Sequence, residues 1–357
     1  MHMANELLSP AVAMGGYVIA GGSVALAARK LRDHLGTELV PLMGVMGAFV
    51  FAAQMINFTL PAMAGTSDHL IGTVLLAVLL GPHAAVIAMT GVLIVQCLIF
   101  QDGGLLALGT NVINMGILPA YVGYGLWRVM IGQPGKLTIG RLLPAVWSAA
   151  FVAVALGAAA VCVEVALSDR LTIPIGKFSM VMVGVHLISG AIEGAITCVV
   201  LVALYRLYPN FAPKELNWHG PRLERGRALA AIAIVAVMVA GAVSWFASPY
   251  ADGLEFAVHE KTHENTPERL KTDNTVAGKV DELQAKYALL PDYGRRSAPL
   301  GAPPQKNNET EKAAAVKNSW PNVSVWTSVS GLLGLGLTMI VIQLIARAIR
   351  RGNVQTS

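Results

Sequence analysis

The feature that most constrains this chain is the recurrence of long apolar stretches separated by short polar breaks. A bilayer core of roughly 30 Å requires about 20 mainly apolar residues for each helical span. The sequence offers such stretches repeatedly, and 55% of its residues are hydrophobic whereas 13% are charged. Because only helices and closed barrels satisfy their backbone hydrogen bonds in lipid, this pattern predicts an all-α integral membrane protein.

The order of apolar runs and basic residues fits nine membrane spans. The first run covers residues 11–28 and is followed at once by Arg29, Lys30 and Arg32. Basic residues favour the cytoplasmic side, so the N-terminus is expected outside the cytoplasm and the C-terminus, after an odd number of crossings, inside it. The other spans are expected at residues 41–60, 70–80, 84–100, 105–127, 142–168, 178–205, 228–246 and 325–346.

A basic loop near residue 210 divides the chain into two units. Residues 1–210 are expected to form a seven-helix bundle, and residues 211–357 a unit of two helices joined by a polar outer loop at about 248–322. This loop is rich in Lys, Glu, Asp, Asn and Pro, with little apolar periodicity. We therefore expect a mostly extended or mobile outer segment.

Charge and cysteine usage exclude two other classes. The formal net charge is +5, but the basic residues lie beside apolar spans, as membrane anchors do, so lipid rather than nucleic acid is the expected partner. The three cysteines lie inside apolar runs without CxxC spacing, which gives no sign of a disulfide framework or a zinc knuckle.

The pair Met1-His2 can chelate a metal ion. A free terminal amine, the amide nitrogen of His2 and its imidazole can close fused rings that place three nitrogens in one plane, a geometry that favours Ni(II) or Cu(II), with low-spin Co(II) possible. His69 is the candidate fourth donor, because it is expected on the same outer side beside the small, polar residues 65–68. The alternative is that His2 is an accident of the translation start and that His69 packs against its helix.

Polar residues inside the apolar spans are a second set of candidates. Asn111 and Asn114 cost free energy in lipid unless they pair with one another, line a cavity or orient a ligand, although ordinary helix packing also uses asparagine. His186 and Glu193 lie seven residues apart, hence on one helix face. They are candidates for metal or proton relay, and equally for a structural ion pair.

Two further motifs define the competing functions. Residues 259–263 read His-Glu-Lys-Thr-His, the pattern of zinc peptidases, so a membrane-embedded peptidase using His259, Glu260 and His263 is one alternative. The polar surroundings and Pro267 nearby argue against it. Residues 132–138 resemble a P-loop but lack the Ser or Thr that should follow Lys136, so no ATP hydrolysis is expected here. A structural membrane subunit is the third possibility.

Together these residues resemble the CbiM/NikM family, the substrate-binding components of energy-coupling-factor cobalt and nickel transporters. The resemblance covers about the first 205 residues and is carried by Met1-His2 and by residues 65–70, 81–82, 96–104, 108–116 and 186–193. From about Asn217 the chain resembles the small two-helix companion component of these transporters. There Asp252-Gly253-Leu254-Glu255 is similar to its PDGLE segment, with the proline displaced to Pro249.

The resemblance implies a substrate-capture subunit, not an enzyme, that imports Ni(II) or Co(II) across the inner cell membrane. The metal would be held by the Met1 amine, the amide and imidazole of His2, and His69. The residues expected to support the site or relay the metal are Ser67, Asp68, Asn111, Asn114, His186 and Glu193. The implied partners are a transmembrane coupling protein and two cytoplasmic ATPase subunits.

Overall fold

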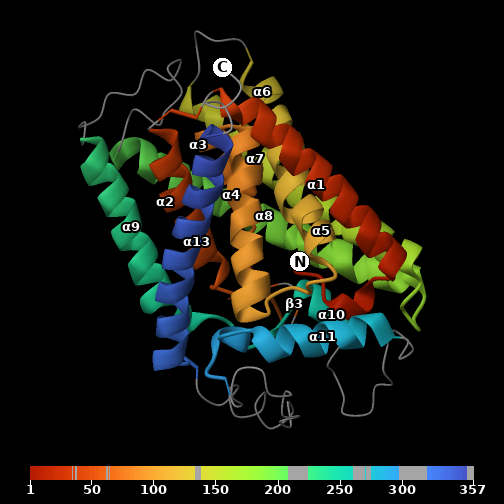
Figure 1. Cartoon of the computed structure of the whole chain (residues 1–357). Coiled ribbons are helices and arrows are strands. Elements are labelled where there is room, and N and C mark those ends of the chain that lie inside the picture. Colours follow the sequence, from red (N-terminus) through yellow and green to blue (C-terminus); the bar gives the residue numbers. More distant parts are fainter. Residues whose placement is uncertain are drawn as a thin grey trace.

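A computed structural model describes most of the chain as a bundle of long helices (Figure 1). The described residues are 1–33, 35–36, 38–61, 63, 65–132, 138–207, 224–259, 270, 275–296 and 320–351. The main helices are α1 (Pro10–Arg32), α2 (Leu39–Gln54), α3 (Thr73–Leu80), α4 (Pro82–Val95), α7 (Ile139–Ser168), α8 (Ile175–Leu207), α9 (Arg225–Gly241) and α13 (Val325–Arg351).

The prediction of a helical membrane protein is confirmed. Within the described residues, five helices are long and apolar enough to cross a bilayer, whereas α2 and the apolar part of α9 are shorter. Apolar side chains also cover the outer faces of the helices, with Val18 exposed to 70% and Val199 to 69%. Such a surface suits lipid rather than water. The total of nine spans stays a prediction.

Local sequence explains where the helices begin and break. Ser9 caps α1, because its hydroxyl accepts a hydrogen bond from the backbone N–H of Val12, and Pro10 follows at the first helical position. Between α3 and α4, Gly81 has φ +85° and Pro82 begins the next helix. A side chain at position 81 would be strained in this left-handed conformation.

The span predicted at residues 105–127 is helical but irregular. A short helix, α5 (Leu108–Asn111), continues through two wide π turns, η3 (Val112–Ile117) and η4 (Pro119–Gly123), into α6 (Tyr124–Ile131). Pro119 has no backbone N–H to donate to the preceding turn. Wide turns of this kind are frequent at functional sites, and η3 carries Asn114, one of the predicted site residues.

Helix α1 crosses α5 at very short range. A Cβ atom on Gly109 would lie 2.5 Å from the backbone nitrogen of Tyr17 and 2.6 Å from the carbonyl carbon of Gly16. Backbone atoms cannot move aside cheaply, so position 109 requires glycine. This crossing fixes the start of α1, and with it the N-terminal residues, beside α5.

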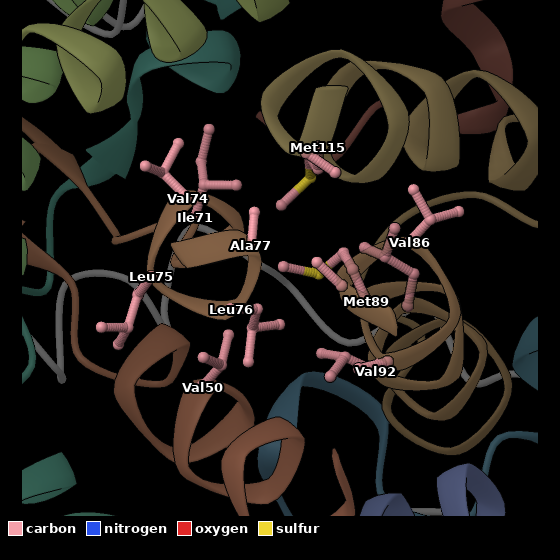
Figure 2. Close-up of a cluster of buried hydrophobic side chains, with 14 of the residues drawn as sticks. Val50, Ile71, Val74, Leu75, Leu76, Ala77, Val86, Met89, Val92 and Met115 are labelled. Atoms are coloured by element: carbon pink, nitrogen blue, oxygen red, sulfur yellow. The ribbon is translucent and has the colours of Figure 1, made fainter. Parts of the chain in front are cut away.

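Apolar side chains from α2, α3, α4 and η3 fill the interior of the bundle (Figure 2). Val50, Leu76 and Met89 are among those almost completely buried. Dense packing of this kind holds the short α3 in place although its eight residues cannot span a bilayer alone.

The C-terminal helices are built into the same bundle. Helix α13 packs against α2 and α4, and α9 packs against α2. Ile342 of α13 contacts Gly47 and Gly91, where a Cβ atom would lie within 2.6 Å of its side chain. The proposed boundary at residue 210 lies outside the described residues, so the division into two units stays a prediction.

In the parts that the structure describes, the segment expected as an extended outer loop is mainly helical, and the rest of that expectation stays a prediction. The segment between α9 and α13 contains η6 (Val243–Phe246), β3 (Ala251–Asp252), α10 (Gly253–His259), α11 (Thr275–Tyr287) and η7 (Pro291–Tyr293). Helix α11 lies across the end of the bundle at which the N-terminus is found (Figure 1). The polar residues of α11 suggested an exposed segment, but one polar face of the helix, which includes Gln284, is buried against the bundle.

A small sheet joins the two parts of the chain at this end. β1 (Phe58–Thr59) pairs antiparallel with β2 (Thr66–Asp68), and β2 pairs parallel with β3. The register places Ser67 opposite Asp252. The segment that carries His69 is therefore held directly against the C-terminal part.

Candidate metal centre

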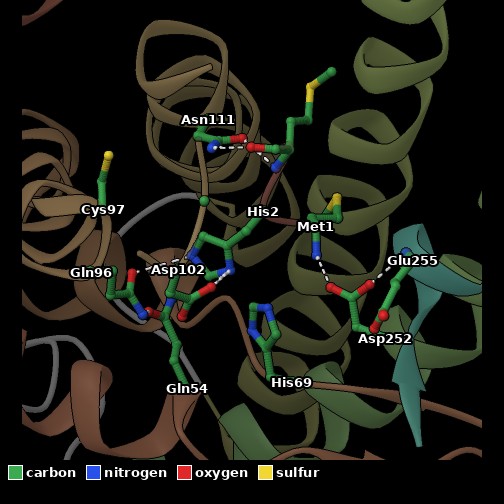
Figure 3. Close-up of polar contacts among 12 residues, drawn as sticks. Met1, His2, Gln54, His69, Gln96, Cys97, Asp102, Asn111, Asp252 and Glu255 are labelled. Atoms are coloured by element: carbon green, nitrogen blue, oxygen red, sulfur yellow. Dashed lines mark hydrogen bonds and ion pairs between the residues drawn. The ribbon is translucent and has the colours of Figure 1, made fainter. Parts of the chain in front are cut away.

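The structure brings the three predicted donors together. Met1 is 1% exposed, and the rings of His2 and His69 lie with centroids 4.9 Å apart (Figure 3). His2 reaches this place because the N-terminal residues enter the end of the bundle ahead of α1. His69 reaches it because it directly follows β2.

The ring of His69 leaves one nitrogen free. Its Nδ1 lies 2.9 Å from the carbonyl oxygen of Leu70, and a carbonyl only accepts, so Nδ1 carries the hydrogen. Nε2 then bears a lone pair, and among the described residues this buried atom has no hydrogen-bond partner. A buried acceptor without a partner costs free energy that a bound cation can recover.

The ring of His2 lies between an amide and a carboxylate. Gln96 donates its Nε2 hydrogen to Gln54 Oε1 at 2.8 Å, so its own Oε1 faces His2 Nε2 at 3.2 Å and accepts from it. Burial lowers the pKa of His2 to about 4, although Asp102 opposes this shift. The ring is therefore neutral at neutral pH, with the lone pair on Nδ1, which lies 3.3 Å from Asp102 Oδ1.

The nitrogen of Met1 faces an acid. It lies 3.5 Å from Asp252 Oδ2 of β3. Burial lowers the pKa of this amine, but the negative charges of Asp252, Asp68 and Asp102 outweigh burial and raise the pKa above its ordinary value. Burial raises the pKa of Asp252, but the amine and the N–H of Glu255 outweigh it and lower the pKa to about 2. Both groups are therefore charged at neutral pH.

The two predicted asparagines hold the N-terminal segment. Asn111 accepts a hydrogen bond from the backbone N–H of Met3 at 2.8 Å and donates to the carbonyl of Met3 at 3.3 Å. Asn114 donates to Glu164 Oε2 at 2.7 Å, and its amide also lies 3.8 Å from Met3 Sδ. Asn111 thus fixes the backbone one residue away from His2.

The other predicted residues surround His69. Asp68 accepts a hydrogen bond from the backbone N–H of His69 at 2.9 Å, and its second oxygen lies 3.6 Å from His186 Nε2. His186 donates its Nδ1 hydrogen to Met182 O at 2.7 Å. Ser67 donates to Tyr250 O at 2.7 Å. These contacts orient the segment that carries His69.

Glu193 is a clamp on the same segment. Its two carboxylate oxygens accept hydrogen bonds from the backbone N–H groups of Ile71 at 2.8 Å and Gly72 at 3.0 Å. These are N–H groups at the start of α3, which have no partner within the helix. Glu193 therefore fixes the chain two residues after His69.

Four residues at the site were not among the predicted ones: Gln54, Gln96, Asp102 and Asp252. Gln54 also donates to Ile71 O at 2.8 Å, so a chain of side chains links His2 to the segment after His69. Gln96 and Asp102 lie in the run 96–104 that carried part of the resemblance, and Asp252 begins the Asp-Gly-Leu-Glu segment. The resemblance of that segment to PDGLE was the sequence signal for Asp252, but it did not predict that Asp252 lies beside Met1.

A cavity of about 640 Å³ opens beside His2 and His69. No Lys or Arg is among its described lining residues, whereas six carboxylates are: Glu6, Asp102, Asp252, Glu255, Asp281 and Asp292. A cavity with this charge attracts cations and repels anions. Both parts of the chain contribute to its walls.

Side chains alone do not complete a metal site. Within the described part of the chain, no three His, Cys, Asp or Glu side chains are grouped as a metal cluster. The other predicted donors are the backbone nitrogens of Met1 and His2, and their ligation of a metal stays a prediction. Of the zinc-peptidase motif, His259 ends α10, while Glu260 and His263 lie outside the described residues.

An apolar helical bundle with a buried, cation-attracting site at one end is the architecture of a membrane transport component. The family model described as cobalt uptake substrate-specific transmembrane region, CbiM, matches residues 2–211, and a PDGLE domain model matches residues 226–351. The chain belongs to the CbiM family and carries a PDGLE domain after the CbiM region.

Similar proteins bear names that agree with this family. A putative metal transport protein of Haloquadratum walsbyi is 37% identical over 212 residues, which cover 59% of this chain and 92% of that protein. A putative fused nickel transport protein of Archaeoglobus fulgidus is 30% identical over 299 residues, 82% of this chain and 88% of that protein. A crystal structure of a transition metal transporter is 30% identical with a TM-score of 0.50, and the match covers 57% of this chain and 92% of the other.

The clamp on α3 leads to the first prediction. Glu193→Gln should lower the free energy of unfolding by about 1–3 kcal/mol, because an amide has one acceptor oxygen and leaves a buried N–H unpaired. The measurement is the denaturation midpoint of the purified protein in detergent. Glu224→Gln is the matched control, since the Glu224 side chain is 80% exposed. Equal midpoints for both variants would contradict the clamp.

Proposed function

We propose that this chain is the substrate-capture subunit of an energy-coupling-factor transporter that imports Ni(II) or Co(II). The observation that carries the proposal is the convergence of the Met1 nitrogen, the His2 ring and the unpaired Nε2 of His69 beside a cavity lined by carboxylates. The relatives named as nickel and cobalt transport proteins support the same substrates.

The proposed ligands are the Met1 amine, the amide and imidazole of His2, and Nε2 of His69. The amine and amide of one chain end, together with His2 Nδ1, form two fused chelate rings, and strong nitrogen donors in one plane favour Ni(II) and low-spin Co(II) over harder cations. The amine and the amide must lose protons on binding. Asp252 and Asp102 lie beside these atoms and offset the positive charge of the metal.

We propose that the protein lies in the inner cell membrane. In the proposed orientation the N-terminus and the sheet face away from the cytoplasm, and the C-terminus lies in the cytoplasm. Helices α1 and α13 each end with basic residues in the last turn, at the end of the bundle opposite α11 (Figure 1). This distribution agrees with the preference of basic residues for the cytoplasmic side. The transport names of the relatives favour this function over a peptidase or a structural subunit.

The ligand set predicts that His69→Ala and His2→Ala each weaken Ni(II) binding by at least about 100-fold, more than the loss of an outer-shell partner. Equilibrium binding to the purified full chain measures this. His83→Ala is the control, because His83 lies at the start of α4 with its ring against Tyr121, remote from the site. Near-normal stoichiometry and affinity in both ligand variants would rule out the site.

The amine ligand makes binding sensitive to what precedes Met1. An extension of Gly-Ser before Met1 turns the amine into an amide and pushes bulk into a position that is 1% exposed, so Ni(II) binding should be lost although every side chain remains. The comparison is metal content of the native, extended and C-terminally tagged proteins. If the extended protein binds as tightly as the tagged one, the amine is not a ligand.

Transport should depend on other chains. We propose a transmembrane coupling protein and two cytoplasmic ATPase subunits as partners, because residues 132–138 lack the Ser or Thr of a P-loop. Cells that express this chain alone should accumulate radioactive Ni(II) no faster than cells with the His69→Ala variant. Uptake by the single chain at the rate of the complete system would contradict the partnership.

A further inference from the structure

Two side chains of the outer segment between α9 and α13 form hydrogen bonds with the loop that carries Asp102. They are Gln284 of α11 and Tyr293 of η7, and both belong to the PDGLE region of the chain. This loop follows η2 (Gln96–Phe100) and runs from Gln101 to Leu105. It approaches the proposed metal ligands at Asp102, whose Oδ1 lies 3.3 Å from His2 Nδ1.

Tyr293 holds the carboxylate itself. Its hydroxyl donates to Asp102 Oδ2 at 2.6 Å, while the other oxygen, Oδ1, lies 3.3 Å from His2 Nδ1. The ring of Tyr293 stacks on Phe100, with centroids 4.6 Å apart and planes inclined by 14°. Ser330 of α13 donates to the carbonyl of Tyr293 at 2.8 Å. These contacts fix the position of the Tyr293 hydroxyl relative to the Asp102 carboxylate.

Gln284 holds the backbone on both sides of Asp102. Its Nε2 donates to the carbonyls of Cys97 at 3.0 Å and Gly103 at 2.8 Å. Its Oε1 accepts from the backbone N–H of Leu105 at 2.9 Å and from Asn5 Nδ2 at 3.0 Å. Gln284 is 5% exposed, so these bonds are protected from water. One side chain thus joins the loop to the N-terminal segment that carries His2.

We propose that Tyr293 and Gln284 are positioning residues that fix the Asp102 carboxylate 3.3 Å from His2 Nδ1, where its negative charge stabilises a cation bound to that nitrogen. The inference rests on the proposed function and adds to it the role of the outer segment. Chelation through Nδ1 requires this nitrogen to lie in the plane of the Met1 and His2 nitrogens. Because Nδ1 carries a lone pair, it cannot hydrogen-bond to the Asp102 carboxylate, and a cation bound to Nδ1 removes the repulsion between these two acceptors.

A purely structural role for Tyr293 makes a different prediction. Phenylalanine retains the ring and its stacking on Phe100, so a packing residue would tolerate the change. Loss of the hydroxyl removes one hydrogen bond to a charged group, a loss that corresponds to a change of about tenfold or more in an equilibrium constant. Tyr293→Phe therefore separates positioning from packing.

The experiment compares Tyr293→Phe, Gln284→Leu and the control Tyr287→Phe in the full chain, with His69→Ala alongside. Tyr287 is 55% exposed on α11. Tyr293→Phe should release Ni(II) about ten times faster to a chelator and shift the visible ligand-field band. In an Asp102→Asn background, which removes the carboxylate, Tyr293→Phe should have little further effect.

A second readout needs no metal. In Gln284→Leu, amide hydrogen exchange should rise in a peptide that covers residues 103–108 and stay unchanged in α7 and α8. Exchange that rises throughout the molecule would assign Gln284 a general structural role and overturn its part in the proposal.

The outcomes separate this inference from the proposed function. If Tyr293→Phe keeps the release rate and spectrum of the parent while His69→Ala loses Ni(II), the positioning role is overturned and the metal site stands. If the parent chain binds no Ni(II), both the proposed metal site and the positioning role are contradicted. If Tyr287→Phe changes the release rate as much as Tyr293→Phe, the effect is not specific to the Asp102 contact and the positioning role falls.

Discussion

The site depends on the burial of a chain end inside an apolar bundle. Backbone N–H and C=O groups removed from water must find partners, or the burial costs several kcal/mol. Met3 meets this condition through Asn111, which pairs with both its N–H and its carbonyl, and through Gly104, whose N–H donates to the same carbonyl at 2.8 Å. These pairs, with the contacts of Met1 to Asp252 and of His2 to Gln96, hold the first two residues beside His69.

The second requirement is that a strand-like segment carry His69 to the same place. Residues 66–68 cannot form a strand alone, and they are stabilised from three directions: by β1, by β3 and by the carboxylate of Glu193 at the start of α3. Each of these supports comes from a different part of the sequence. The geometry of the centre is therefore a property of the whole end of the molecule at which the N-terminus lies.

The membrane class, the long helices and the family could be predicted, because hydropathy and local motifs depend on near neighbours in the sequence. The approach of Asp252 to Met1 could not, since it joins residues about 250 positions apart through the pairing of β2 with β3. Helix α11 was missed because its buried face carries Gln284 and the partly buried Asp281 beside the small Ala277, so that no row of large apolar residues marks it in the sequence. The roles of Met1, His2 and His69 as ligands stay predictions.

The continuity of α8 and α9 in one polypeptide affects how the outer segment works. Because the segment that carries Gln284 is tethered to the bundle, its docking is intramolecular, and a flexible tether commonly gives an effective concentration of the order of millimolar. Contacts that are individually weak can then keep the segment in place most of the time. The walls that this segment contributes to the cavity therefore stay beside the bundle without a separate binding event.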